Sequence, residues 1–284
     1  MAKDSSIEWT HHTFNPWWGC TKVSPGCKHC YAETFSHRIG QDIWGPRAER
    51  RFFSDAHWRD PLKWNAEAAR AGVRRRVFCA SMADVFENRA ELNPHRERLW
   101  QLIADTPSLD WLLLTKRPDR ILKSVPWGSI WPTNVWAGVT AENQLWARRR
   151  IPLLLELPAV VRFLSCEPLL GALDLTQWLT GSRRVDWVIA GGESGHKARP
   201  MNPEWARKLR DQCRASGVAF HFKQWGHWRP DYANAASARR RVAVADSNGR
   251  AITLVRLGKH AAGRELDGRT WDEFPALKSE PASA

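Results

Sequence analysis

The stretch Asn202–Phe222, NPEWARKLRDQCRASGVAFHF, predicts the repeating unit of the fold. It opens with Asn-Pro, a helix cap followed by the proline that the first helical turn favours. Tryptophan, leucine and cysteine residues then recur every four positions, which places them on one helical face. Gly217 ends this helix, and Ala219–Phe222 is a short apolar run typical of a buried strand. The pattern predicts a helix that packs on a sheet, with Cys213 as a core residue.

Similar short apolar runs recur along the chain, each followed by a polar turn and a helical pattern. The predicted strands are Phe14–Trp18, Val77–Ala80, Trp111–Leu114, Val135–Val139, Val161–Leu164, Trp187–Ala190 and Ala219–Phe222. Strands that alternate with helices favour parallel pairing and right-handed crossovers. A length of 284 residues suits one barrel-sized domain. We therefore expect an α/β protein with a partial or near-complete parallel (β/α) barrel of six to seven strands.

The alternation of strand and helix patterns ends near residue 230, so we expect a barrel domain over residues 1–230 and an appendage over residues 231–284. Ala233–Arg241 is interpreted as a small, basic linker. Arg241–Ala245 and Ala251–Leu257 flank the turn sequence DSNG, which predicts a β-hairpin. The C-terminal appendage is therefore a linker, a hairpin and an irregular tail.

The formal net charge of +13 indicates an anionic partner, such as nucleic acid or a phosphorylated substrate. Arg74–Arg76, Arg148–Arg150 and Arg239–Arg241 would meet phosphate if they shared one face, and are otherwise solvated surface. No run of eighteen apolar residues predicts a membrane span, and Met1–His12 is too polar for a signal peptide. We expect a cytoplasmic protein that does not enter a membrane.

Three of the six cysteines lie in the stretch Gly19–Tyr31, GCTKVSPGCKHCY, with C-x6-C-x2-C spacing. A cytoplasmic chain argues against disulfides, so the cluster indicates a metal site. Three thiolates on one loop, those of Cys20, Cys27 and Cys30, can hold three irons of a [4Fe–4S] cube. The fourth iron then stays open for a substrate or cofactor.

Zinc is the competing metal, and it requires four protein ligands in a structural site. No second C-x2-C pair exists in the sequence. The fourth ligand would then be His11, His12 or His37. Three thiols that hold no metal are the remaining alternative.

Chemistry in parallel β/α folds gathers at the carboxyl ends of the strands. The polar residues that follow the predicted strands are Ser81, Asp84 and Glu87; Lys116 and Arg117; Thr140, Glu142 and Asn143; Ser165, Cys166 and Glu167; Glu193 and Ser194; and Lys223 and Gln224. We predict that Lys116 binds an anionic substrate group. Cys166 and Glu167 are the predicted hydrogen donor or substrate contact, with a buried apolar thiol as the alternative for Cys166.

A three-cysteine loop after the first strand of a β/α barrel resembles the radical S-adenosylmethionine superfamily, whose commonest spacing is C-x3-C-x2-C. The strings NPWWGC (15–20), VSPGCKHCYAE (23–33) and GGESG (191–195) resemble a family of phage-type proteins with the C-x6-C-x2-C motif. The resemblance implies that Cys20, Cys27 and Cys30 ligate a [4Fe–4S] cluster. It also implies reductive cleavage of S-adenosylmethionine and radical chemistry on an anionic substrate, such as a nucleic acid undergoing modification or repair.

By the same resemblance, Gly191-Gly192-Glu193 corresponds to a GGE element that receives the methionine amino group. That element normally follows the second strand, whereas here it follows the sixth, so Glu193 could instead hold ribose or substrate. The residues expected to bind the cofactor are Gly191, Gly192, Glu193, Ser194, Ser81, Asp84 and Thr140. The expected partners are DNA or RNA, an electron donor such as flavodoxin or ferredoxin, and a partner protein. The alternative is a nucleic-acid-binding protein whose iron–sulfur or zinc site is structural.

Overall fold

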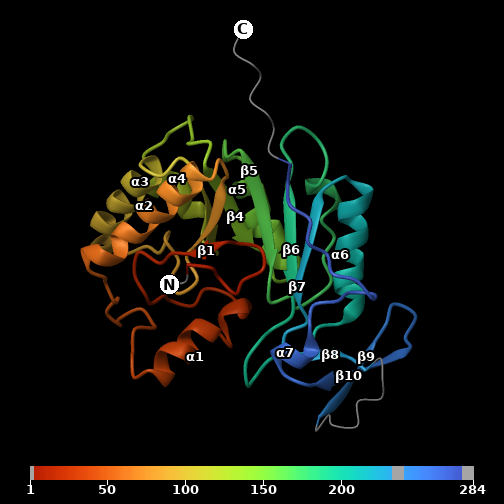
Figure 1. Cartoon of the computed structure of the whole chain (residues 1–284). Coiled ribbons are helices and arrows are strands. Elements are labelled where there is room, and N and C mark those ends of the chain that lie inside the picture. The colour runs from red at the N-terminus through yellow and green to blue at the C-terminus, as the bar shows by residue number, and fades with distance from the viewer. Residues whose placement is uncertain (1–2, 232–239, 277–284) are drawn as a thin grey trace.

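The computed structural model describes residues 3–231 and 240–276. Within them, seven parallel strands form one sheet whose spatial order follows the sequence (Figure 1). The strands are β1 (His12–Thr13), β2 (Arg75–Cys79), β3 (Leu109–Thr115), β4 (Val135–Thr140), β5 (Val161–Cys166), β6 (Trp187–Gly191) and β7 (Ala219–Gln224). The edge strands β1 and β7 do not pair with each other, so the sheet is a partial (β/α) barrel, as the sequence predicts.

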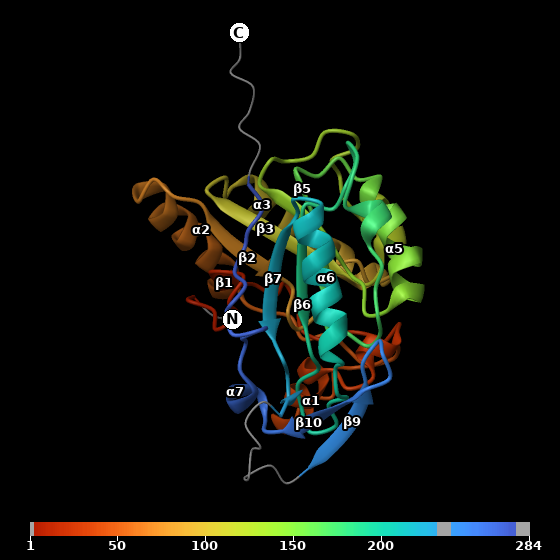
Figure 2. The same ribbon diagram turned by 90° about the vertical axis from the view of Figure 1, so that its right-hand side faces the viewer.

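Helices cover the outer face of this sheet (Figures 1 and 2). They are α2 (Asp55–Arg70), α3 (Asn93–Ala104), α4 (Ile121–Ser124), α5 (Gln144–Leu155) and α6 (Pro203–Ala215). Helix α1 (Tyr31–Arg38) instead lies below the carboxyl ends of the strands, as does α7 (Lys259–Ala262). The predicted cap of α6 is confirmed, because the side chain of Asn202 accepts a hydrogen bond from the backbone of Glu204.

The first strand differs from the prediction, because the sheet contains His12–Thr13 and not Phe14–Trp18. The chain leaves the sheet at Asn15-Pro16, where proline has no N–H for a ladder. Instead of a backbone ladder bond, the side-chain Oδ1 of Asn15 accepts a hydrogen bond from the backbone N–H of Met82 at 2.7 Å. Trp18 then forms an isolated antiparallel bridge with Arg51. The apolar run is buried as loop, not as strand.

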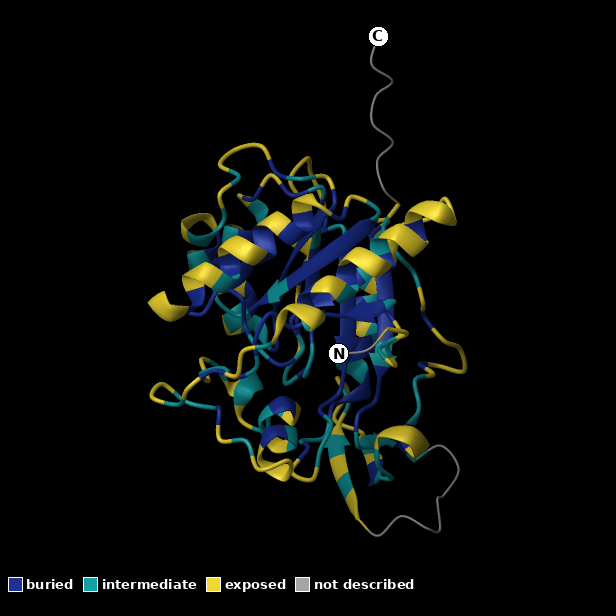
Figure 3. Cartoon of the chain, turned by 60° about the vertical axis from the view of Figure 1, so that its left-hand side comes forward, coloured by how far each residue is buried: buried dark blue, intermediate teal, exposed yellow. Residues whose placement is uncertain are grey.

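Side chains of the strands alternate between two cores, and the strands themselves are almost wholly buried (Figure 3). The outer core packs against the helices. The inner core fills the concave side with large rings and includes Trp9, Phe78, Trp136, Phe163 and Trp187. At position 138 a Cβ would lie 2.2 Å from the ring of Phe163, so glycine there makes room for that ring. The interior is thus solid at the amino ends of the strands.

Residues 271–274, here called the closing segment, run along the exposed edge of β7. The backbone N–H of Phe222 donates to the carbonyl of Trp271, and Trp187 Nε1 donates to the carbonyl of Glu273. The ring of Phe274 lies 3.8 Å from the guanidinium of Arg76 at the start of β2. The closing segment therefore fills the seam that the open sheet leaves.

A small antiparallel sheet lies beside α7, at the carboxyl end of the barrel (Figure 1). Its strands are β8 (Trp228–Pro230), β9 (Arg241–Ala245) and β10 (Ala251–Arg256), in the order β8-β10-β9. The predicted hairpin is confirmed, with β8 as a third strand. Most of the predicted linker lies outside the described residues. No helix in the described ranges is long and apolar enough to cross a membrane.

Candidate active site

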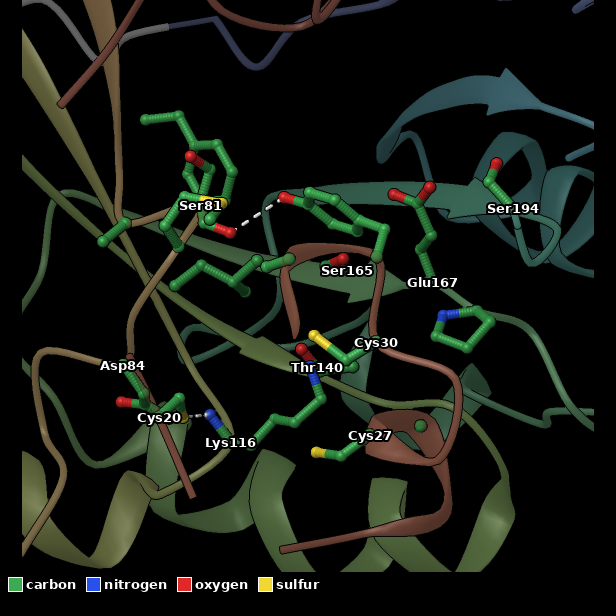
Figure 4. A pocket seen from close by; sticks show the side chains of 18 of the residues that line it. Cys20, Cys27, Cys30, Ser81, Asp84, Lys116, Thr140, Ser165, Glu167 and Ser194 are labelled. Atoms are coloured by element: carbon green, nitrogen blue, oxygen red, sulfur yellow. Dashed lines mark hydrogen bonds between the residues drawn. The ribbon is translucent and has the colours of Figure 1, made fainter. Parts of the chain in front are cut away.

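A cavity of about 590 Å³ opens at the carboxyl ends of the strands, beside the cysteine loop (Figure 4). Most of the predicted site residues meet there. Those that line the cavity are Cys20, Cys27, Cys30, Ser81, Asp84, Lys116, Thr140, Glu167, Gly192, Glu193 and Ser194. The fold therefore brings together side chains from a loop near the N-terminus and from the ends of five strands, β2 to β6.

The three cysteines of the loop are free thiols that face this common space. Burial, helped by the charge of Asp84, raises the pKa of Cys20 to about 12. Burial also raises the pKa of Cys30. A metal would therefore displace protons from these thiols when it binds. In the described ranges, no three His, Cys, Asp or Glu side chains are grouped to hold a single metal ion.

Positive groups stand beside the thiols, which suits an anionic thiolate cluster. Arg117 Nη1 lies 3.8 Å from the Sγ of Cys20. The charge of Lys116 opposes the burial effect on the pKa of Cys30. The Lys116 side chain extends between Cys30 and Thr140 (Figure 4), and no carboxylate in the described part of the chain pairs with it. The donor set therefore fits a three-thiolate iron–sulfur cluster.

Asp84 is fixed by a dense set of donors. Thr115 Oγ1 donates to it at 2.7 Å and Arg117 Nη1 at 2.9 Å, and the backbone N–H groups of Lys116 and Phe86 add two more bonds. Burial alone would raise the pKa of Asp84, but Arg117 and these hydrogen bonds lower it overall. Asp84 is a charged anchor for Arg117.

Glu193 accepts from donors on two separate segments. Arg199 donates to it from Nη2, Nε and the backbone N–H at 2.5–2.8 Å. The Nδ1 of His29, in the cysteine loop, lies 3.2 Å from Glu193 Oε2. Burial opposes ionisation of Glu193, but these contacts lower its pKa overall. Glu193 thus joins the end of β6 to the cysteine loop.

The cavity wall at the ends of β5, β6 and β7 carries a second polar network. Lys223 Nζ contacts both oxygens of Glu167 at 2.8–2.9 Å. Gln224 Nε2 donates to Glu167 and to Ser194 Oγ. The Oε1 of Gln224 is buried and has no hydrogen-bond partner in the described residues. This wall therefore offers an unused acceptor to a ligand.

Cys166 does not line the cavity, although its neighbours Ser165 and Glu167 do. Alternation along β5 turns Ser165 to the concave side and Cys166 to the outer core, where it is fully buried. Burial raises the pKa of Cys166 well above its ordinary value. The position of Cys166 matches the buried apolar thiol and not a hydrogen donor to substrate.

The glycine pair at the end of β6 has a packing role. At position 192 a Cβ would lie 2.0 Å from the backbone oxygen of Trp225, so only glycine lets these segments touch. Gly191 is the last residue of β6 and does not line the cavity. Close approach of chain to chain therefore accounts for Gly192.

Among the described residues, burial and ion pairs interrupt the arginine surface considered from the sequence. Arg150 is 2% exposed and pairs with Glu142 at 2.7 Å, so it cannot meet phosphate. Arg74 pairs with Asp110, and Arg75 begins β2, at the end of the strand away from the cavity. Arg239 lies outside the described residues.

Several cavity residues carried no sequence signal. Ser5, Ile7 and Trp9 line the cavity because the N-terminal segment folds beneath it. Tyr31 donates from its hydroxyl to the carbonyl of Ser81 at 2.9 Å. Its position next to the last cysteine of the motif is the one feature that could have drawn attention to it.

Fold and site together define a partial (β/α) barrel with a three-cysteine loop at the carboxyl ends of its strands. The chain belongs to the family described as "Protein of unknown function (DUF5131)", whose model matches residues 4–275. No curated protein matches the chain.

Among solved structures, the chain is similar to spore photoproduct lyase. A mutant of that protein with bound AdoMet and dinucleoside spore photoproduct has a TM-score of 0.43 at 13% identity, covering 87% of this chain and 68% of that chain. Spore photoproduct lyase complexed with dinucleoside spore photoproduct has a TM-score of 0.45 at 12% identity, covering 90% and 71%.

Proposed function

We propose that the protein is a radical S-adenosylmethionine enzyme. Its site would use a [4Fe–4S] cluster on Cys20, Cys27 and Cys30 to act on an anionic substrate. The observation that carries the proposal is that the three thiols share one cavity with the ammonium of Lys116, which no carboxylate of residues 3–231 or 240–276 pairs with. Three ligands on one loop leave one iron of a cube open.

In this proposal, the residues around the three cysteines have separate roles. The three thiolates would hold the cluster, and Arg117 would donate to the sulfur of Cys20. When bound, such a cluster supplies one electron for the reductive cleavage of S-adenosylmethionine. The apolar floor, which includes Trp9 and Phe78, excludes water from the site.

The remaining polar wall would orient the cofactor and the substrate. Thr140 and Ser165 present hydroxyls at the ends of β4 and β5. Gln224 offers its free Oε1 to a donor, and the Glu167–Lys223 pair fixes the position of that amide. These groups favour a ligand with both donors and acceptors.

Lys116 is half-buried and has no carboxylate partner among the described residues, which favours a negative group on the ligand. A nucleic acid or a nucleotide carries such groups, and the net charge of +13 would favour its approach. We propose it as the substrate class, with a cytoplasmic electron donor such as flavodoxin or ferredoxin.

The test is anaerobic reconstitution with iron and sulfide, followed by reduction in the presence of S-adenosylmethionine. We expect about four irons per chain and formation of 5′-deoxyadenosine and methionine, measured by chromatography. One tightly held zinc in a colourless protein would contradict the proposal. Iron without cleavage would support the alternative of a structural cluster in a nucleic-acid-binding protein.

A further inference from the structure

Three carboxylates at the ends of alternate strands reach the cysteine loop. Asp84 follows β2, Glu142 follows β4 and Glu193 follows β6. Each contacts the loop beside a different cysteine, either directly or through an arginine.

The first contact is at Cys20. Arg117, held by Asp84 at 2.9 Å, donates from Nη2 to the carbonyl of Thr21 at 2.6 Å. Its Nη1 reaches Cys20 Sγ. Asp84 therefore fixes this end of the loop through one guanidinium group.

The second contact is at Cys27. The backbone N–H of Gly26 donates to Glu142 Oε1 at 3.3 Å, and Arg150 holds the other oxygen of Glu142 at 2.7 Å. Glu142 is fully buried. A Cβ at position 26 would lie 3.2 Å from the carboxyl group, so the loop is packed tightly against it.

The third contact is at Cys30, through its neighbour His29. Glu193 lies 3.2 Å from His29 Nδ1, while Arg199 Nη2 donates to the carbonyl of Pro25 at 3.0 Å. Glu193 thus holds the loop at two points, once directly and once through Arg199.

Donors crowd Glu193, and three of the four contacts fall on one oxygen, Oε2. An ionised carboxylate has about four lone-pair positions. Three donors of Arg199 and one nitrogen of His29 contact it. Oε1 accepts one bond, from Arg199 Nη2, so a methionine ammonium could approach only the remaining position of that oxygen. The side chain is also only 5% exposed.

We propose that Asp84, Glu142 and Glu193 are positioning residues that set the places of Cys20, Cys27 and Cys30 before any cofactor binds. Glu193 is then an anchor of the loop and not a ligand of S-adenosylmethionine. The identity of the cofactor in this inference rests on the proposed function. The anchoring of the loop can be tested separately, in protein without iron. Preformed ligands lower the ordering cost of binding.

Of the three carboxylates, Glu193 can be neutralised with the least damage to the fold. Its partner Arg199 is 29% exposed, so water can solvate the arginine when the carboxylate is lost. The variants are Glu193→Gln, His29→Ala and the conservative His29→Asn, which keeps a side-chain nitrogen near the carboxylate. Asp110→Asn is the matched control: it removes a 5% exposed carboxylate that pairs with Arg74, away from the loop. Circular dichroism and thermal unfolding establish that each variant folds.

Two measurements follow on each protein. In metal-free protein, we expect Cys30 to be alkylated faster in Glu193→Gln and His29→Ala, because the loop is released. In reconstituted protein, we expect iron release to a chelator to rise about tenfold to a hundredfold, as the loss of one charge-assisted hydrogen bond produces. His29→Asn should restore most of the wild-type behaviour. The affinity of cluster-loaded protein for S-adenosylmethionine should stay within about twofold of wild type.

The opposite pattern would overturn the inference. If Glu193→Gln keeps its iron and its thiol reactivity but loses affinity for S-adenosylmethionine, Glu193 is a cofactor ligand and the proposed function stands. If wild-type protein binds no iron, the proposed function fails. The alkylation rates then still decide the anchoring, since an unchanged Cys30 rate in both variants contradicts it.

Discussion

Arg117 and Cys20 are 97 residues apart in the sequence, yet the guanidinium of Arg117 donates to the sulfur of Cys20 at 3.8 Å. The contact places a fixed positive charge at one corner of the candidate cluster site. Hydrogen bonds to ligand sulfurs are among the factors that set the potentials of iron–sulfur clusters.

Arg117→Lys should shift the midpoint potential of the reconstituted cluster to more negative values. Lysine keeps the charge but cannot reach Asp84, Thr21 and Cys20 together with one planar group. A lost donor to sulfur leaves the reduced, electron-rich state less stabilised. The measurement is a potentiometric titration followed by electron paramagnetic resonance. Arg120→Lys is the control, since Arg120 lies in the same turn and contacts Asn88. Equal potentials in both variants would assign Arg117 a purely structural role.

Alanine at Cys20, Cys27 or Cys30 should each remove most of the iron from anaerobically prepared protein. Each thiolate is expected to hold one iron of the cube, and the loop supplies no substitute. The control is Cys166→Ala, which we expect to retain iron because that thiol faces the outer core. Iron and sulfide are counted per chain. Retained iron in all three loop variants would contradict the ligand assignment.

Lys116→Gln should weaken binding of an anionic substrate. For labelled single- and double-stranded DNA and RNA, we expect lower affinity and a salt dependence reduced by about one counterion. Arg149→Gln, on the exposed surface of α5, is the matched control and should change little. Binding is titrated at several salt concentrations. A larger effect of Arg149→Gln would mean that the nucleic acid binds to the outer surface of the barrel. If the wild-type protein shows no micromolar binding even at low salt, a small-molecule substrate is the better interpretation.

His221 should make the fold sensitive to acid. Burial lowers its pKa to about 4, with Arg264 adding to the effect and Asp272 opposing it. The folded state therefore resists a proton that the unfolded chain accepts near pH 6.5, and stability falls as pH drops from about 6.5 to about 4. The loss attributable to His221 is on the order of 3 kcal/mol.

Urea unfolding of wild type and His221→Gln across this pH range isolates that contribution. Other histidines with lowered pKa values, such as His11, titrate equally in both proteins. We expect a shallower pH dependence in the variant. If the free energy of unfolding depends on pH equally in both proteins, protonation of His221 does not destabilise the fold.

The sequence predicted the sheet well because each strand from β2 to β7 is a short apolar run beside turn residues. It failed at β1, where Asn15-Pro16 ends pairing although the run stays apolar and buried. Neighbouring side chains of a strand face opposite sides of the sheet, so if Ser165 faces the cavity, Cys166 must face away from it. The buried orientation of Cys166, which the sequence analysis kept as an alternative, was therefore predictable.

The anchoring of the cysteine loop was not predictable in the same way. His29 and Glu193 are 164 residues apart, and Gly26 and Glu142 are 116 apart. No local pattern in the sequence pairs such residues, because their contact depends on how six strands stack. The GGE resemblance pointed to a cofactor role for Glu193, whereas Arg199 and His29 occupy its oxygens.

The closing segment bears on the order in which the protein is made. Residues 271–274 supply the ring and the backbone acceptors that cover β7, Trp187 and Arg76. A ribosome completes all seven strands well before it reaches these residues. The nascent barrel therefore exposes the aromatic rings of its interior through an open side, where a chaperone or another unfinished chain can bind.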